Sequence, residues 1–402
     1  MDPVSDSFRQ TIHTTASPAE AFRFFRHETA LRDWLCDRAY LNARMNGMLY
    51  FLFPNGYTVQ GKLIEYTPDK HLEFSWLTLP DRGQSTVEVT VSETEAGTEV
   101  TFTHQNPDET ARLKWADWLE NYQSVLEDGI DLRIARRPRL GIMIEEFNPE
   151  IAQKIGVPVQ QRLRLGGTVE GTGARSAGLD NDDVIVSLNG HPVRDFDSLG
   201  VLLQGLHAGD QPEVVFYRGS TQQSVPLTLS SFPIFKAPPP AELASQYRKN
   251  ASEVLAAWAA HLSGVSEEQA ALQPAENEWS AREILAHFTL CERDYQGWVA
   301  DMVNDTPVED WLQMRPNVFT RIQSLVKRRS NLPALLEELS AAQEETADFL
   351  ENLPESFVNQ RKHLYRRAAQ WALEVVPSHY FDEHKEQIEK TLIKAKLSDT
   401  HN

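Results

Sequence analysis

The sequence predicts a multidomain protein with an α+β domain, a mainly-β domain and an all-α four-helix bundle, in that order. Three observations lead to this fold class. Runs that alternate apolar and polar residues fill much of 1–135, shorter runs separated by glycine-rich turns follow over 139–232, and apolar residues recur at helical spacing over 241–402. At about 150 residues per domain, a chain of 402 residues has room for two or three such domains.

Residues 1–135 begin with a helix and continue as a sheet. Ser17, Pro18 and Glu20 suit the N-cap, N1 and N3 positions of a helix. In the run 86–92, three valines alternate with polar residues, as expected for a strand with one buried face. The predicted strands cover 48–53, 58–66, 71–77, 85–92 and 98–104. An amphipathic pattern over 108–134 predicts a long helix against this sheet, and a cavity can lie between the two.

Prolines mark the boundary before the last domain. Residues 233–240 form a Pro-rich linker that ends in three consecutive prolines, a sequence that favours an extended chain. Beyond the linker, the helical pattern occupies four long stretches, which predict a bundle. These stretches are 241–263, 279–303, 332–353 and 363–395.

The composition excludes several classes of protein. With 39 basic and 58 acidic residues the formal net charge is −19, which disfavours binding to nucleic-acid phosphates. No stretch reaches the roughly 18 consecutive apolar residues of a membrane helix, and the N-terminus has no secretory-signal pattern. The two cysteines, Cys36 and Cys291, form neither a CxxC motif nor a disulfide framework. We therefore expect a cytoplasmic protein with no nucleic-acid or membrane partner.

The first domain, 1–135, resembles the SRPBCC superfamily, in the branch named after the activator of the heat-shock protein 90 ATPase. The resemblance rests on the runs 17–22, 74–76 and 97–104 and on several tryptophans. It implies a helix-grip fold, in which a curved antiparallel sheet wraps around a long helix, often with an apolar cavity between them. The side chains that would line such a cavity are Trp34, Trp76, His104 and Trp118. The alternative, which aromatic side chains favour, is that they fill the space as ordinary core.

Residues 139–232 resemble PDZ domains of the bacterial kind, through the runs 140–144, 174–193 and 195–206. The turn at 140–142 would hold a terminal carboxylate, and Gly141 would let its backbone approach closely. An extended peptide or protein C-terminus would then add as a further strand. The predicted peptide-binding residues are Arg139, Leu140, Gly141, Ile142, Leu199, Leu202 and Leu203. The alternative is a spacer domain whose groove is blocked by its neighbours.

Residues 241–402 resemble the DinB-like four-helix bundles, through the runs 277–288 and 379–388. The resemblance implies a metal held by His287 and by a histidine pair on the last helix, His379 and His384. Three imidazoles with open positions suit a zinc, nickel or iron(II) ion. The family spaces its last pair four residues apart, whereas these two are five apart, which is about 140° off one face of a regular helix. A π-bulge would restore a common face, Tyr380 could substitute for His379, and the alternative is a lost metal site.

The sequence contains no complete catalytic constellation, so whether the protein is an enzyme stays open. The leading hypothesis is a binding or adaptor protein, in which the PDZ-like domain docks a peptide or protein C-terminus and the helix-grip domain holds a small apolar ligand or a client surface. One alternative is a metal-dependent transferase or hydrolase, of the thiol-transfer class, with its site in the bundle. Another alternative is a cochaperone that stimulates a chaperone ATPase.

Overall fold

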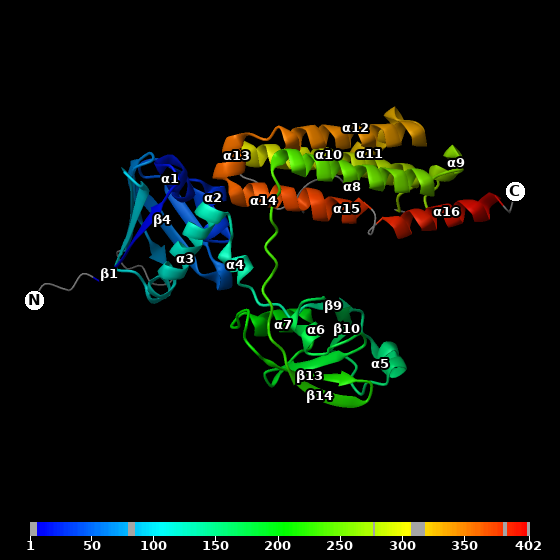
Figure 1. The fold of residues 1–402 in the computed structure, drawn as a ribbon, viewed down its shortest axis with the longest axis horizontal. Helices are drawn as coiled ribbons and strands as arrows, with labels where there is room; N and C mark the ends of the chain where they lie inside the picture. The colour runs from blue at the N-terminus through cyan, green and yellow to red at the C-terminus, as the bar shows by residue number, and fades with distance from the viewer. Residues whose placement is uncertain (1–5, 79–84, 276–277, 307–317, 381–383, 400–402) are drawn as a thin grey trace, which may run out of the picture. The chain divides into compact units, whose positions relative to one another are not determined.

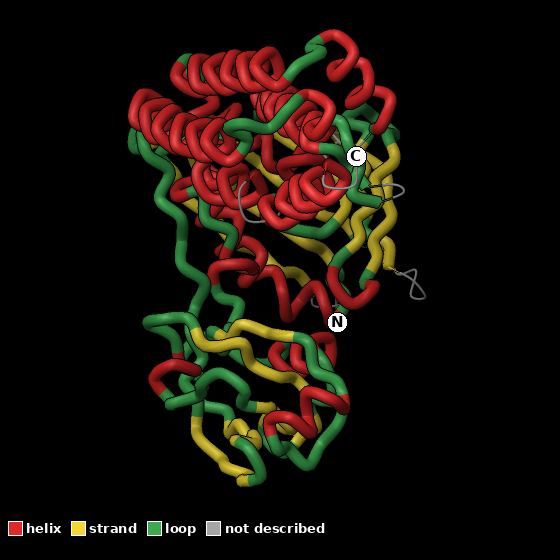
Figure 2. The backbone as a smooth tube through the Cα atoms, turned by 90° about the vertical axis from the view of Figure 1, so that its right-hand side faces the viewer, coloured by secondary structure: helices red, strands yellow, loops and turns green. Residues whose placement is uncertain are grey.

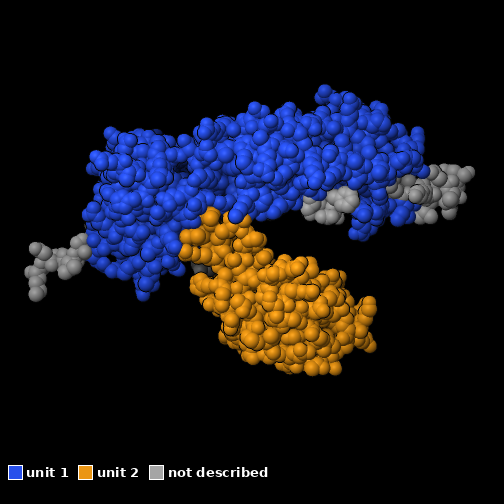
Figure 3. Space-filling view, in the orientation of Figure 1, with its two compact units in different colours: residues 1–129, 235–402 blue, residues 130–234 orange. Residues whose placement is uncertain are grey.

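The computed structural model describes residues 6–78, 85–275, 278–306, 318–380 and 384–399. It divides into two compact units, which are coloured separately in Figure 3. Unit 1 combines Met1–Gly129 with Phe235–Asn402, and unit 2 is Ile130–Ile234. The N-terminal and helical domains predicted above therefore fall in one unit, and the mainly-β domain forms the other.

The N-terminal part of unit 1 is an antiparallel sheet that wraps around a long helix, α3 (Figure 1). The strands follow the order β1-β8-β7-β5-β4-β3-β2, and β6 pairs with β4. Their bounds are β1 (Ser7–Thr14), β2 (Arg38–Leu41), β3 (Met48–Leu52), β4 (Thr58–Thr67), β5 (His71–Ser75), β6 (Leu77–Thr78), β7 (Thr86–Thr94) and β8 (Gly97–Gln105). The helices are α1 (Pro18–Arg26), α2 (Glu28–Trp34) and α3 (Glu109–Asp128), with a 3-10 turn at Pro54–Gly56.

Capping residues define where these helices begin and end. Ser17 and Glu20 form the capping box predicted for α1, with each side chain bonded to the other's backbone N–H. The side chain of Asp108 accepts the N–H of Ala111 at the start of α3. Gly129 ends that helix with a φ of 65°, a left-handed conformation that glycine adopts without a side-chain clash. Helix α3 thus has a defined length across the sheet and packs its apolar face on it.

The C-terminal part of unit 1 is almost entirely helical (Figure 2). Three long helices, α8, α10 and α12, pack side by side. The elements are α8 (Pro240–His261), α9 (Glu267–Ala270), α10 (Ala281–Val303), α11 (Phe319–Arg328), α12 (Leu332–Glu351), α13 (Glu355–Gln360), α14 (Lys362–Gln370), the π-helical segment Trp371–Val375, α15 (Val376–Ser378) and α16 (Lys385–Asp399). The fourth helical run, from α14 to α16, contacts both α8 and α10.

This fourth run differs from the single helix that the sequence predicted over 363–395. It leaves α-helical geometry at Trp371–Val375, and again at His379 and Tyr380, where the backbone is π-helical. Pro377 lies between the two π segments and has no N–H to donate to the preceding turn. A π turn has more residues per turn than an α turn, so it changes which side chains share a face.

Unit 2 is a small antiparallel sheet with short helices around one apolar core. The strand order is β14-β13-β11-β10-β9, and β12 pairs with β11. The strands are β9 (Ile142–Glu145), β10 (Leu163–Thr168), β11 (Val184–Leu188), β12 (His191–Pro192), β13 (Glu213–Arg218) and β14 (Thr221–Pro226). The helices are α4 (Leu132–Ala135), α5 (Pro149–Ile155), α6 (Gly173–Ser176) and α7 (Phe196–Leu203). Strand β9 lies at one edge of this sheet.

Candidate functional site

His287 is placed in the interior of the helical region by the start of α10. Ser280 and Glu283 form a capping box: Ser280 N and Oγ donate to Glu283 Oε2 at 2.7 and 2.8 Å, and Glu283 N donates to Ser280 Oγ at 3.3 Å. The cap sets where α10 begins and so which residues face inward. His287 lies two turns further on and is buried, with the Trp279 ring 5.0 Å from its own.

The π-helical backbone at His379 and Tyr380 brings His379 next to His287. Their Nε2 atoms are 3.1 Å apart. One ligand nitrogen from each of His287, His379 and His384 lies within 4.8 Å of the others, and the ring centroids are 4.9–5.3 Å apart. The five-residue spacing therefore does not keep the last two histidines apart; the backbone at His379 and Tyr380 is π-helical, and the 140° offset expected for a regular α-helix does not apply there.

The Nδ1 atom of His384 has a defined hydrogen-bond partner. It lies 3.0 Å from Gln387 Oε1, one turn further along the chain. A hydrogen bond at one ring nitrogen orients the imidazole and assigns the other nitrogen to a ligand. Gln387 thus does for His384 what outer partners commonly do for histidines at metal centres.

A buried thiol adjoins the three imidazoles. Cys291 Sγ lies 3.5 Å from His287 Nε2 and 3.9 Å from His379 Nε2. Its side chain comes from α10, one turn after His287, and only 2% of the residue is exposed. The sequence analysis considered Cys291 only for disulfides and missed this position. The available signal was the four-residue spacing from His287, which puts both side chains on one helix face.

A buried carboxylate, Glu292, lies next to this cluster and was also missed. It accepts three hydroxyl hydrogen bonds: from Tyr247 Oη at 2.6 Å, from Thr346 Oγ1 at 2.7 Å and from Tyr380 Oη at 2.8 Å. Burial raises the pKa of the Glu292 carboxyl, although the three hydroxyl donors oppose that shift. Glu292 therefore joins α8, α10 and α12 to the π turn.

Tyr380, considered above as a substitute metal ligand, belongs to this hydrogen-bond network instead. The Tyr380 hydroxyl is bonded to Glu292 and lies 3.2 Å from the carbonyl oxygen of Phe288, and its ring packs 4.7 Å from the Phe288 ring. The structure brings His287, His379 and His384 together and directs Tyr380 to Glu292 instead. The bond to Glu292 thus fixes Tyr380, and Tyr380 directly follows His379 in the chain.

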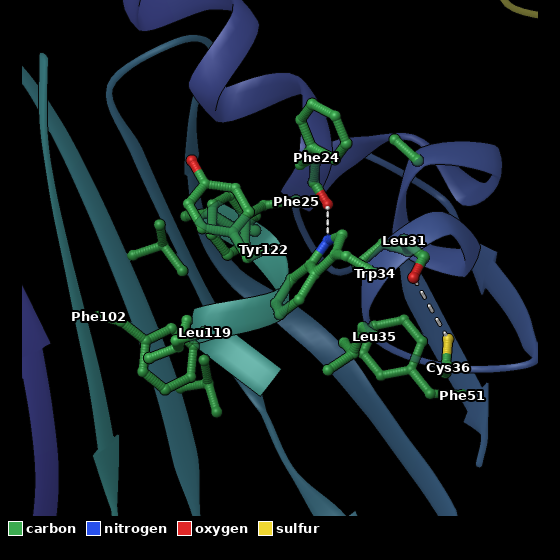
Figure 4. Close-up of a cluster of buried hydrophobic side chains, with 14 of the residues drawn as sticks. Phe24, Phe25, Leu31, Trp34, Leu35, Cys36, Phe51, Phe102, Leu119 and Tyr122 are labelled. Atoms are coloured by element: carbon green, nitrogen blue, oxygen red, sulfur yellow. Dashed lines mark hydrogen bonds between the residues drawn. The ribbon is translucent and has the colours of Figure 1, made fainter. Parts of the chain in front are cut away.

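The interior of the helix-grip domain is filled by its own side chains (Figure 4). Of the four side chains predicted to line a cavity, Trp34, Trp76 and His104 are buried in packed core and Trp118 stacks on Phe53 with centroids 4.8 Å apart. A cavity of about 10 Å³ remains against Trp34, no more than one water requires. Within the described residues, the space predicted for an apolar ligand is therefore occupied by core.

His104 is a hydrogen-bonded core histidine. Its Nδ1 accepts the indole N–H of Trp115 at 2.7 Å, and its Nε2 lies 2.5 Å from Ser85 Oγ. Burial lowers the pKa of His104 to about 4, so the ring is neutral at pH 7. Because Nδ1 accepts from Trp115, the ring proton sits on Nε2 and is donated to Ser85.

In unit 2, Gly141 has a left-handed backbone conformation. Its φ is 83°, and a Cβ at this position would lie 2.1 Å from Thr172 Oγ1. The adjacent strand β9 exposes Met143 and Ile144. Thr172 and Gly141 are also joined by a hydrogen bond of 3.3 Å from Thr172 Oγ1 to the Gly141 carbonyl.

The other predicted peptide-binding residues have mixed surroundings. Leu140 and Leu199 are buried in the core of unit 2, and Ile142, Leu202 and Leu203 are partly buried against it. Arg139 pairs with Ser230 through the backbone. Leu199 is thus a core residue and presents no surface to a peptide. Leu140 and Gly141 are buried as well, so the exposed side chains at this sheet edge are those of strand β9.

Within the part of the chain that the structure describes, no helix is both long and apolar enough to span a bilayer.

Comparisons with known proteins agree with two of the three resemblances. Residues 15–128 match the family model described as Activator of Hsp90 ATPase homolog 1-like protein, and residues 250–388 match the DinB superfamily model. Among solved structures, protein MLL2253 from Mesorhizobium loti is 17% identical with a TM-score of 0.29, covering 32% of this chain and 100% of that one. Protein CV1439 from Chromobacterium violaceum is 21% identical with a TM-score of 0.26, covering 30% and 96%.

Curated relatives match over a short stretch. A probable periplasmic serine endoprotease DegP-like protein of Rhizobium meliloti is 30% identical over 123 residues, 29% of this chain and 24% of that protein. The periplasmic serine endoprotease DegP of Escherichia coli is 32% identical over 94 residues, 23% of this chain and 20% of that protein. The chain thus spans about a quarter or less of these relatives. From the two family models, the chain contains a domain of the activator of Hsp90 ATPase homolog 1-like family followed, after unit 2, by a domain of the DinB superfamily.

Proposed function

We propose that the helical region binds one divalent transition metal through His287, His379 and His384 and acts as a metal-dependent transferase or hydrolase. The observation that carries the proposal is the convergence of three imidazoles, with two Nε2 atoms 3.1 Å apart. Imidazole nitrogens are ligands of intermediate softness, which suits zinc, nickel or iron(II) better than magnesium or calcium.

The protein's contribution to such a centre is orientation and exclusion of water. Gln387 orients His384, and Glu292 holds Tyr380 and with it the π turn that carries His379. His287 is buried, and Phe288 packs against the His384 ring at 5.3 Å. When bound, the metal would supply Lewis acidity, lowering the pKa of a coordinated water or substrate thiol.

The experiment is elemental analysis of protein purified without a tag or chelator. We expect about one equivalent of transition metal in the unchanged protein, and its loss in His287→Ala and in His384→Ala. His207→Ala is the matched control, because His207 lies in unit 2 and its side chain is largely exposed. Full metal content in all three variants would refute the site, and a folded parent protein with no metal even after reconstitution would refute the function.

We also propose that unit 2 docks an extended peptide C-terminus at strand β9. Support comes from the edge position of β9, its exposed Met143 and Ile144, and the left-handed Gly141 at its start. An edge strand offers backbone hydrogen bonds that a peptide can complete, and a turn of backbone N–H groups can hold a carboxylate.

The test of docking is a binding assay of the full chain with labelled peptides that differ only at their C-terminus. Peptides with a free carboxylate should bind, and the same peptides with an amidated terminus should bind at least about tenfold more weakly. Equal binding of both forms, or no binder in a broad library, would refute carboxylate docking at this edge.

A further inference from the structure

The end of α10 opposite to His287 is bonded to the helix-grip domain, and both belong to unit 1. The guanidinium of Arg23, on α1, donates from Nε to Asp305 Oδ2 at 2.9 Å and from Nη2 to Asp305 Oδ1. Asp305 lies just after α10, and the two side chains are 9% and 14% exposed. A bidentate pair has a defined geometry, and burial protects this one from water. The end of α10 is therefore fixed against α1.

The helix-grip domain also holds the first turns of α14. Arg366 donates to the carbonyl oxygens of Asp128 and Gly129 at 2.5 and 2.6 Å. These carbonyls lie at the C-terminal end of α3, where a helix has no backbone donors of its own and carries partial negative charge. On the same helix, His363 Nε2 lies 2.6 Å from Asp33 Oδ2 of α2. Helix α14 thus starts at a fixed position on α2 and α3.

Arg361, the residue before α14, joins these two helix ends. Its Nη1 donates to the carbonyl oxygens of Met302 and Val303 at 2.9 and 2.8 Å. Its Nη2 lies 3.8 Å from Asp305 Oδ2. We refer to the residues that join the end of α10 and the start of α14 to the helix-grip domain as the clamp: Arg23, Asp305, Arg361 and Arg366.

Two helical runs lead from the clamp to the histidines. Helix α10 carries His287 near its start, and the run that begins with α14 is helical without interruption to Tyr380 and carries His379. At 1.5 Å per residue, 287–303 spans about 24 Å, whereas 361–379 would span about 27 Å as a regular α-helix. The π turns wind more residues into a given length and so shorten the second run. Because both runs start at one clamp and have similar lengths, their histidines meet, with Nε2 atoms 3.1 Å apart.

We infer that the helix-grip domain positions the metal site, because the clamp sets the register of His379 against His287. This inference rests on the metal-binding function proposed above. The clamp residues lie at the other end of α10 from the histidines, so they are positioning residues that act through the two helical runs. The filled interior of the helix-grip domain suits this role, since a close-packed core holds its surface residues in fixed positions.

Zinc competition with a chelator tests the inference in the full chain with Arg23→Ala. Without this pair α14 can shift against α10, so zinc affinity should fall at least about threefold. The visible absorption bands of the cobalt(II)-loaded protein, which report the arrangement of the ligands, should also shift. Val89→Ala is the matched control, because Val89 is buried in the helix-grip core and this change leaves the clamp in place. At a temperature where both variants are folded, Val89→Ala should keep the zinc affinity and cobalt bands of the parent protein.

The outcomes separate this inference from the function on which it rests. Unchanged zinc affinity or unchanged cobalt bands in Arg23→Ala, or equal losses of affinity in Arg23→Ala and Val89→Ala, overturn the positioning role and leave metal binding intact. Absence of zinc binding in the folded parent protein overturns both. If Arg23→Ala does not fold, Asp305→Asn takes its place, since it removes the charge that Arg23 binds and keeps the size of the side chain; the same results then carry the same meaning.

Discussion

Removal of one hydroxyl group, in Tyr380→Phe, should weaken both the helical region and its metal site. Tyr380 Oη donates to the buried Glu292 carboxylate at 2.8 Å, and His379 is the residue before it. A hydrogen bond to a buried charged group contributes about 1.5–3 kcal/mol, so we expect the free energy of unfolding to fall by about that amount. Because the same bond holds the π turn, zinc affinity should fall by about 10–100-fold, as for other outer partners of metal ligands.

The matched control is Tyr247→Phe, which removes a donor at 2.6 Å from the same carboxylate but from α8, away from the histidines. Urea denaturation of metal-free protein, followed by the helical circular dichroism signal, should show comparable destabilisation of both variants. Zinc competition with a chelator should show the larger loss of affinity only for Tyr380→Phe. Equal affinity loss in both variants, or none in either, would refute the positioning role of Tyr380.

Three further predictions concern pH, backbone conformation and metal. Burial lowers the pKa of His104 to about 4, below the 6.5 or so of an unfolded chain, so only the unfolded state gains a proton as the pH falls from about 6.5 to 4. The free energy of unfolding of the helix-grip domain should therefore fall over that window. Thermal unfolding followed by tryptophan fluorescence should show a flatter pH dependence of stability in His104→Asn. An unchanged slope would refute the lowered pKa of His104. Gly141→Ala should lower the free energy of unfolding, measured by chemical denaturation, by about 1–3 kcal/mol, because φ is 83° and the new Cβ would meet Thr172. Gly156→Ala, where φ is 73° and the space is open, should lower it less, and equal losses would refute the clash with Thr172. Zinc at about 100 times its dissociation constant should raise the free energy of unfolding of the parent protein by about 2.7 kcal/mol and leave that of His287→Ala unchanged. An equal increase in both proteins would show that zinc binds at another site.

Elements with strong local signals were predicted from the sequence. The helical spacing of apolar residues predicted a helix over 279–303, and α10 spans Ala281–Val303. The five predicted strands correspond to β3, β4, β5 with β6, β7 and β8. The edge strands β1 and β2 were not predicted, because an edge strand exposes polar side chains and its hydrophobic alternation is weak.

The candidate site was predicted only in part, for a physical reason. The family resemblance implied the three histidines, whereas their spacing argued against a common face for His379 and His384, since a π turn leaves no periodic pattern to read. The space between sheet and α3 could not be assigned as cavity or core from aromatic content, because that depends on how the rings pack. Glu292 could not be placed at all, since its partners come from α8, α12 and the π turn.

The central claim is that one metal ion sits among His287, His379 and His384. The most direct measurement is anomalous diffraction at the zinc edge from crystals of the full chain grown with one equivalent of zinc. The account predicts a single anomalous peak bounded by the three imidazoles, within about 2.0–2.1 Å of one nitrogen of each. Fully zinc-bound crystals with no peak at these residues, or with the peak at another site, would contradict it.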